Sequence, residues 1–141
     1  KSPSDYAKEM LEFTDALHEE YSCGAFYIYI DPSAKGLAEE IKRIAMQSRK
    51  YNIIIKDAEN DVSIGIQRVQ KCLTYQTISE RQENLIREMG TYEYDPKPVE
   101  SGKEKPMKID DHCCDAWRYL VMGLWTKIKY FLPEGERGEN D

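Results

Sequence analysis

The stretch that decides the fold is Ala25-Phe26-Tyr27-Ile28-Tyr29-Ile30, followed at once by Asp31-Pro32-Ser33. A continuous run of apolar, β-branched and aromatic residues is typical of a strand covered on both faces, as in the middle of an α/β sheet. Because proline removes a ladder donor, the strand is predicted to end at Ile30. Ligands of open α/β sheets collect beyond the carboxyl ends of the strands, which is where Asp31 lies.

Helical and extended patterns alternate around this strand. The predicted elements are a helix from Ser2-Pro3 to about Glu20, a helix containing Leu37, Ile41, Ile44 and Ala45, a strand at 52–56, and a helix capped by Asn60 or Asp61. The expected core faces are Tyr6, Met10, Phe13 and Leu17 on the first helix, and Val62, Ile66, Val69 and Leu73 on the third. This alternation predicts an α/β layer with parallel neighbouring strands.

The C-terminal half is predicted to be mostly helical. Residues 75–78 are a candidate third strand, and Ser79 with Gln82 fits a capping box for a helix ending near Gly90. A polar loop at 95–108 precedes a last helix, expected from 110–112 to Phe131, with Trp117, Leu120, Leu124, Ile128 and Phe131 on its apolar stripe. We predict one domain over 1–132 and a charged, frayed tail over 133–141.

Composition is that of a soluble globular chain. Its 141 residues allow one domain, and the chain begins at Lys1, so we expect it to be cut from something longer. No apolar run approaches the roughly 18–20 residues that span a bilayer, so no membrane partner is expected. A net charge of −6 argues against coating nucleic acid by bulk charge but allows a local basic patch. The cysteines and histidines lack the spacing of a zinc site or a disulfide scaffold, which favours a reducing cytoplasm.

Asp31 has two interpretations. As a partly buried carboxylate at the sheet edge, it would need a cation or hydrogen-bond donors to offset the loss of solvation. As the first residue of an Asp-Pro pair, it would open a turn. The local sequence leaves both interpretations open.

A second polar group, Asp110 to Asp115 with His112 among them, opens the last helix. His112 and Asp115 are spaced i, i+3, and Asp111 and Asp115 i, i+4, so the members of each pair share a helix face. Carboxylates with one imidazole suit Mg²⁺ or Mn²⁺. The alternative is that these acids complement the helix dipole and cap the first turn, one of Asp110 and Asp111 being expected to cap.

Four lysines lead into this acidic group: Lys97, Lys103, Lys105 and Lys108. On composition alone they form a solvated surface loop. Beside a metal site, the same lysines would be phosphate contacts.

Five stretches occur together in an order that resembles a known family. They are Tyr29-Ile30-Asp31-Pro32-Ser33-Ala34, Asn60-Asp61-Val62 with Gly65-Ile66, Asn84-Leu85-Ile86-Arg87-Glu88, Tyr92-Glu93-Tyr94-Asp95, and the segment from Gly102 to Tyr119. Over about residues 2–125, the chain resembles the C-terminal nuclease domain of the terminase large subunit of tailed bacteriophages and prophages.

The resemblance implies an α/β, RNase H-like fold: a five-stranded mixed sheet in the order 3-2-1-4-5, flanked by helices. It implies an endonuclease that cuts concatemeric double-stranded DNA during packaging, in a parent protein with an ATPase domain. Two ions, Mg²⁺ or Mn²⁺, would hydrolyse the phosphodiester. The implied partners besides DNA are the portal and the small terminase subunit, and the implied location is the host bacterial cytoplasm.

The resemblance also implies roles for individual residues. The catalytic metal ligands would be Asp31, His112 and Asp115. Beside these, we expect Asp111 as a further ligand, Lys105 and Lys108 on DNA, and Glu88 as a secondary candidate for the site. The family's first acid, however, lies on the first strand of the sheet, and residues 1–24 contain no strand pattern. We therefore expect the first strands and the first acid to be missing from this chain, which alone would have little or no nuclease activity. A strand without its neighbour would favour self-association.

Two alternatives stay open. Another RNase H-like nuclease, such as a resolvase or integrase relative, shares acids on a strand end and a last helix, but the motif order after Asn60 disfavours it. A non-catalytic docking fragment for portal or packaging proteins is compatible with the acidic net charge.

Overall fold

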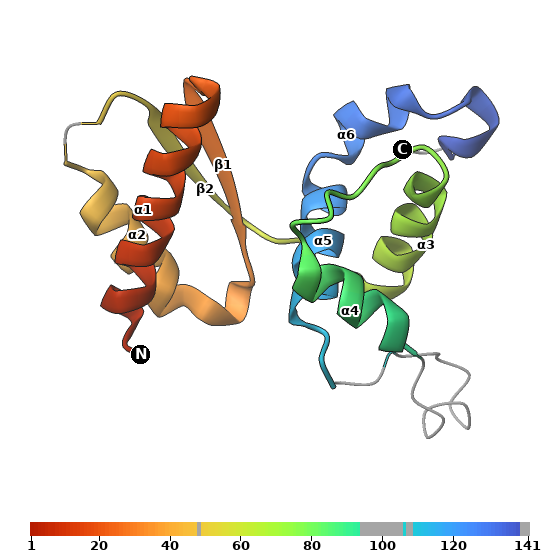
Figure 1. Ribbon diagram of the computed structural model, residues 1–141, viewed down its shortest axis with the longest axis horizontal. Helices are drawn as coiled ribbons and strands as arrows, with labels where there is room; N and C mark the ends of the chain where they lie inside the picture. The colour runs from red at the N-terminus through yellow and green to blue at the C-terminus, as the bar shows by residue number, and fades with distance from the viewer. Residues whose placement is uncertain (48, 94–105, 107–108, 139–141) are drawn as a thin grey trace. The chain divides into compact units, whose positions relative to one another are not determined.

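The computed structural model describes residues 1–47, 49–93, 106 and 109–138 (Figure 1). The chain divides into two compact units, Lys1–Ala58 and Glu59–Asp141, and each is described by itself. Except for Pro106, the stretch 94–108 lies outside the described residues, and so do most of the predicted loop at 95–108 and the end of the tail.

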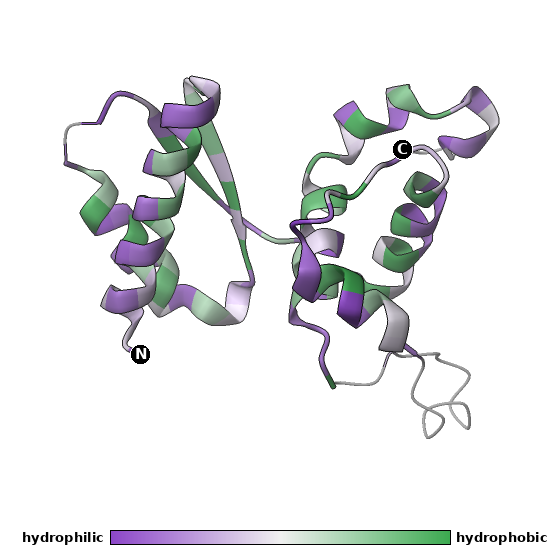
Figure 2. Cartoon of the chain, viewed as in Figure 1, coloured by the Kyte–Doolittle hydropathy of each residue, from purple (hydrophilic) through white to green (hydrophobic). Residues whose placement is uncertain are grey.

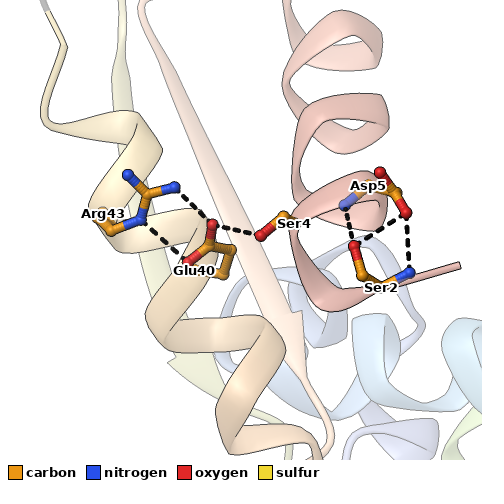
Figure 3. A network of polar contacts seen from close by, with 5 residues as sticks. All are labelled: Ser2, Ser4, Asp5, Glu40 and Arg43. Carbon is orange, nitrogen blue, oxygen red and sulfur yellow. Dashed lines mark hydrogen bonds and ion pairs between the residues drawn. The ribbon is translucent and has the colours of Figure 1, made fainter.

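The first unit opens with α1 (Pro3–Tyr21), whose start is fixed by a capping box (Figure 3). Ser2 Oγ accepts from the Asp5 backbone N–H at 3.2 Å, and Asp5 Oδ2 accepts from the Ser2 backbone N–H at 2.9 Å. Ser22, in the left-handed region at φ 54°, ends the helix. The predicted start of this helix is confirmed, and its end lies one residue beyond the expected Glu20.

Two parallel strands form the sheet of this unit, β1 (Ala25–Ile30) and β2 (Asn52–Asp57). Their register runs from Ala25 beside Asn52 to Ile30 beside Asp57. Between them lie the short 3-10 turn η1 (Pro32–Ala34) and α2 (Lys35–Ala45). Both predicted strands, the intervening helix and the parallel pairing are confirmed.

The core of the first unit lies between the two helices and one face of the sheet. Figure 2 shows hydrophobic residues along both strands. The fully or nearly buried residues are Ala7, Ile30 and Ile41, with Met10, Ile28, Leu37, Ile44, Ile53 and Ile55 partly buried against them. Because side chains alternate along a strand, Ile28 and Ile30 reach this core together.

A polar contact also joins the two helices (Figure 3). Ser4 Oγ on α1 donates to Glu40 Oε1 on α2 at 2.7 Å. Arg43 donates to the same carboxylate through Nη2 at 2.6 Å and Nε at 3.0 Å.

Two expectations about this unit are wrong. The buried face of α1 is Ala7, Leu11 and Thr14, whereas Tyr6 and Phe13 are 50% and 59% exposed. The small Ala7 lets α1 approach α2 closely, so the face with larger side chains turns outward. Nor is β1 covered on both faces: Tyr27 is 49% exposed, because both helices share a core with the face of Ile28 and Ile30.

The second unit is helical over the residues described. Its helices are α3 (Val62–Leu73), α4 (Glu83–Thr91), α5 (His112–Gly123) and α6 (Trp125–Ile128), followed by the 3-10 turns η3 (Lys129–Phe131) and η4 (Glu134–Glu136). Both α3 and α4 pack against α5 (Figure 1). The buried core consists of Cys72, Trp117, Val121, Trp125 and Leu132. The predicted cap of α3 is confirmed at Asp61, whose Oδ1 accepts from the Ile64 backbone N–H at 3.0 Å.

The structure corrects three predictions between α3 and α4. Residues 75–78 form no strand, since the Tyr75 backbone N–H donates to Cys72 O at 2.9 Å in a turn. Ser79 makes no capping box, because its Oγ accepts from the Arg81 backbone N–H at 3.3 Å and α4 begins only after Gln82. On α3, Val69 packs against the core as expected, but Gly65 and Cys72 are the buried residues and Leu73 is 43% exposed. The core face is therefore partly rotated from the one expected.

The last helix is shorter than predicted. It is interrupted at Leu124, where φ is −103° and ψ is 8°. The break lets Trp125 and Leu132 reach the core at 2% and 3% exposure, while Leu120 and Phe131 of the predicted stripe are 47% and 85% exposed. Over the part of the chain described, no helix is long and apolar enough to cross a membrane.

Candidate metal centre

The site residues predicted from sequence fall in both units. Asp31 follows β1 in the first unit, while Asp111, His112 and Asp115 lie together at the start of α5 in the second. Lys105 and Lys108 lie outside the described residues. Three of the proposed ligands thus lie at the N-cap and in the first turn of one helix.

Asp31 forms a turn. Its Oδ1 accepts from the Ser33 backbone N–H at 2.8 Å, and its carbonyl accepts from the Ala34 backbone N–H at 2.8 Å. The turn interpretation is therefore confirmed. A carboxylate offers about four lone-pair positions, so a turn bond at one oxygen does not exhaust its capacity to bind a cation. The ligand interpretation stays a prediction.

A second acid, Asp57, lies at the same edge of the sheet as Asp31. Asp57 is the last residue of β2 and stands beside Ile30 in the parallel register. Parallel strands present their carboxyl ends at one edge, so Asp57 and Asp31 share that edge. The sequence signal for Asp57 is an acid that directly follows the apolar run ending at Lys56, and the motifs above do not include it.

The start of α5 is capped by a residue of another helix. Glu88 on α4 is only 4% exposed, and its Oε2 accepts from the backbone N–H groups of Cys113 at 2.7 Å and Cys114 at 3.0 Å. These bonds and the positive end of the helix dipole compensate the buried charge. Of the two residues Asp110 and Asp111, one of which is expected to cap, Asp111 stands at the N-cap position and makes no side-chain cap. Glu88 accepts from the N–H groups of this turn instead.

Asp115 is held by an ion pair with Arg118. Its Oδ1 accepts from Arg118 Nη2 at 3.1 Å, and its side chain is 17% exposed. Arg118 Nη1 in turn donates to Asn60 Oδ1 at 3.0 Å. Asn60 belongs to the Asn60-Asp61-Val62 motif, so two separate motifs of the sequence meet through one guanidinium.

The remaining ligand candidates differ in accessibility. His112, the first residue of α5, is exposed, whereas Asp111 is only 5% exposed. Within the described ranges, no three His, Cys, Asp or Glu side chains are grouped closely enough to hold a metal ion.

The two thiols beside these residues have raised pKa values. Burial, and after it the Glu88 carboxylate, raises the pKa of the Cys113 thiol and raises the pKa of Cys114 to about 11. Burial, assisted by the charge of Asp115, raises the pKa of Tyr92 to about 12. In the absence of a bound cation, these groups are therefore protonated at neutral pH.

Comparison with known proteins decides the family. A sequence profile described as "Terminase RNAseH like domain" matches residues 46–122, more than half of the chain. The chain belongs to the terminase RNase H-like domain family. Asp111, His112 and Asp115 fall inside the matched range, together with Asn60, Gly65, Glu88 and Arg118. Asp31 falls outside it.

Solved structures agree with this assignment. The large terminase from a thermophilic bacteriophage, in complex with ADP, is 27% identical with a TM-score of 0.70, covering 86% of this chain and 28% of that one. Another structure of the same phage's large terminase is 25% identical with a TM-score of 0.71, covering 87% of this chain and 29% of that one. The chain thus spans less than a third of the length of these large terminases. No curated protein sequence matches it significantly.

The terminase family confirms the resemblance drawn from the ordered motifs and the RNase H-like α/β fold class. Residues from three of these motifs meet at α5. The helix α5 contains Arg118 as well as His112 and Asp115. It is contacted by Glu88, Asn60 and Gly65.

Proposed function

We propose that this chain is part of the metal-dependent endonuclease of a viral DNA-packaging terminase large subunit, acting on concatemeric double-stranded DNA. The observation that carries the proposal is the fixed Asp115 carboxylate on the first turns of α5, with exposed His112 beside it. Asp31, His112 and Asp115, with Asp111, would hold Mg²⁺ or Mn²⁺. When bound, two such ions would supply an activated water and stabilise the leaving oxygen in phosphodiester hydrolysis.

The donor set fits a hard divalent cation. Carboxylate oxygens with one imidazole suit Mg²⁺ or Mn²⁺, whereas soft metals prefer thiolate ligands, and the proposed ligand set contains no cysteine. Glu88 is engaged with the backbone of α5, so it orients the ligand-bearing helix and is not proposed as a ligand.

Metal binding and DNA cleavage test the proposal. Titration calorimetry of the full-length protein with Mn²⁺ is expected to show binding that Asp31→Ala and Asp115→Ala abolish. Glu83→Gln is the matched control, because Glu83 is an exposed acid in the first turn of α4. Cleavage of plasmid DNA is expected to require Mn²⁺ or Mg²⁺ and to show no sequence preference. Absence of Mn²⁺ binding in the full-length protein would refute the metal assignment.

Lys105 and Lys108 are proposed as phosphate contacts. If each neutralises one phosphate, replacing either by alanine lowers the slope of log affinity against log salt by about 0.9 on duplex DNA. Sequence preference is expected to stay unchanged, since phosphate contacts carry no base information. A host bacterial cytoplasm is the proposed location.

The alternative function is a non-catalytic docking fragment for the portal, the small terminase subunit or another packaging protein. Exposed aromatic residues of the first unit, Tyr6, Phe13 and Tyr27, support it. Self-association is proposed through β1, which has one strand neighbour within the described residues. A full-length protein that binds Mn²⁺ but never cuts DNA would favour docking.

A further inference from the structure

Arg118 is the most buried charged side chain among the residues described, at 2% exposure. A buried guanidinium is costly unless its charge and its donors are matched. Both terminal nitrogens of Arg118 have partners, whereas its Nε is buried without a hydrogen-bond partner among the described residues. Here Nη2 donates to Asp115 Oδ1 at 3.1 Å and Nη1 donates to Asn60 Oδ1 at 3.0 Å. The guanidinium is planar, so two partners on different nitrogens fix both its position and its plane. Asp115 is therefore held by a rigid group.

The stem of Arg118 passes α3 at Gly65. A Cβ added to Gly65 would lie 2.5 Å from Arg118 Cγ and 2.7 Å from Cδ, closer than such atoms approach. A glycine inside a helix costs about 1 kcal/mol relative to alanine. Gly65 does not have a positive φ, so the backbone alone does not require glycine. Glycine is required at position 65 because the Arg118 side chain passes close to it.

We propose that Arg118 is the positioning residue of the metal centre: it orients the Asp115 carboxylate, and Asn60 and Gly65 fix Arg118 in turn. The proposal rests on the proposed function, in which Asp115 binds the metal. Loss of a hydrogen-bond partner of a metal ligand typically weakens metal binding about 10- to 100-fold. Arg118 reaches the metal only through Asp115.

An opposite effect of Arg118 must be weighed against this one. A guanidinium beside a metal ligand repels the cation, so charge alone predicts tighter metal binding once Arg118 is neutralised. If Arg118 orients the Asp115 carboxylate, its replacement is instead predicted to weaken metal binding. Arg118→Gln removes the charge and Arg118→Lys keeps it, and both lose the two-nitrogen fork. Positioning is therefore supported only if both variants bind metal more weakly.

The experiment measures Mn²⁺ affinity of the full-length protein from the electron paramagnetic resonance of free Mn²⁺. Arg118→Lys, Arg118→Gln, Asn60→Ala and Gly65→Ala are each expected to weaken binding roughly tenfold. Gly90→Ala in α4 is the matched control, because a Cβ there meets nothing within 4 Å. The Mn²⁺ concentration for half-maximal cleavage is expected to rise in parallel, with the KM for DNA unchanged. If Arg118 had only a structural role, the Mn²⁺ concentration needed for cleavage and the KM for DNA would change together.

Folding is checked by the fluorescence of Trp117 and Trp125, both of which lie in the second unit. If Gly65→Ala fails to fold, Asn60→Ala decides, because Asn60 is exposed and its loss removes only an acceptor of Arg118. Wild-type Mn²⁺ affinity in folded Arg118→Lys and Asn60→Ala would overturn the proposal, as would tighter binding in Arg118→Gln. If Asp115→Asn leaves Mn²⁺ binding intact, the metal assignment itself fails and the positioning role fails with it.

Discussion

At the scale of single residues, Glu40 shows how a surface carboxylate can be strongly perturbed. The Arg43 guanidinium, and after it the Ser4 hydroxyl, lowers the pKa of Glu40 from its ordinary 4.5 to about 2 (Figure 3). A lowered folded-state pKa gives stability that is present above pH 4.5 and lost as pH falls towards 2. The contact of α1 with α2 is therefore expected to weaken in this acidic range.

Carbon-13 nuclear magnetic resonance of the Glu40 carboxyl tests this prediction. The titration midpoint is expected near pH 2 in the wild type and closer to 4.5 in Arg43→Gln. Lys42→Gln is the matched control, since Lys42 Nζ pairs with Glu39 Oε1 at 3.3 Å and not with Glu40. A wild-type midpoint above about 4 would contradict the prediction.

Sequence reasoning at this scale succeeds where partners are close in the chain. The caps by Ser2 and Asp61 lie within three residues of the groups they bind, and the sequence predicted both. Glu88 reaches Cys113 and Cys114 across 25 and 26 residues, and Arg118 reaches Asn60 across 58. Those bonds depend on tertiary packing, which local patterns do not contain.

At the scale of elements, the start of α5 depends on α4. Glu88→Ala would leave two backbone N–H groups at the start of α5 without their charged acceptor, at an expected cost of about 2 kcal/mol. Glu88→Gln keeps an acceptor and is expected to cost about half as much.

Urea unfolding followed by tryptophan fluorescence measures this cost in the second unit, which holds both tryptophans. Glu83→Ala, at an exposed acid of the same helix, is the control and is expected to change stability by less than about 0.5 kcal/mol. Equal effects of Glu88→Ala and Glu83→Ala would show that the cap does not stabilise α5.

Periodicity located β1, β2 and the main helices because each carries a sustained pattern. It failed at 75–78, where a short β-prone run has no neighbouring strand to pair with among the described residues and only Ile78 packs against the core. It failed again at Leu124, where an apolar residue at helical spacing concealed a break. The cause is the packing of Trp125 and Leu132, a tertiary effect that overrides local propensity.

At the scale of the whole molecule, the alternation of helices and strands predicted the parallel pair of β1 and β2, and the ordered motifs predicted the family. The proposed ligands, however, are divided between the units, with Asp31 in the first and Asp115 in the second. Spacing along one helix could group His112 with Asp115. No local rule could relate them to Asp31, which lies near the other end of the chain and in a different unit.

The placement of proposed metal ligands in both units can be tested by measurement. If Asp31 and Asp115 bind the same ion, that ion stabilises each unit, by about 2.7 kcal/mol when its concentration is about one hundred times its dissociation constant. Hydrogen exchange of the full-length protein is therefore expected to slow in peptides from β1 and from α5 when Mg²⁺ is added. Linkage is reciprocal, so Asp31→Asn is expected to abolish the protection of α5, and Asp115→Asn that of β1. Glu12→Gln, at an exposed position of α1, is expected to leave both intact. Protection confined to α5 peptides would show that Asp31 serves the turn at Ser33 and does not bind the metal.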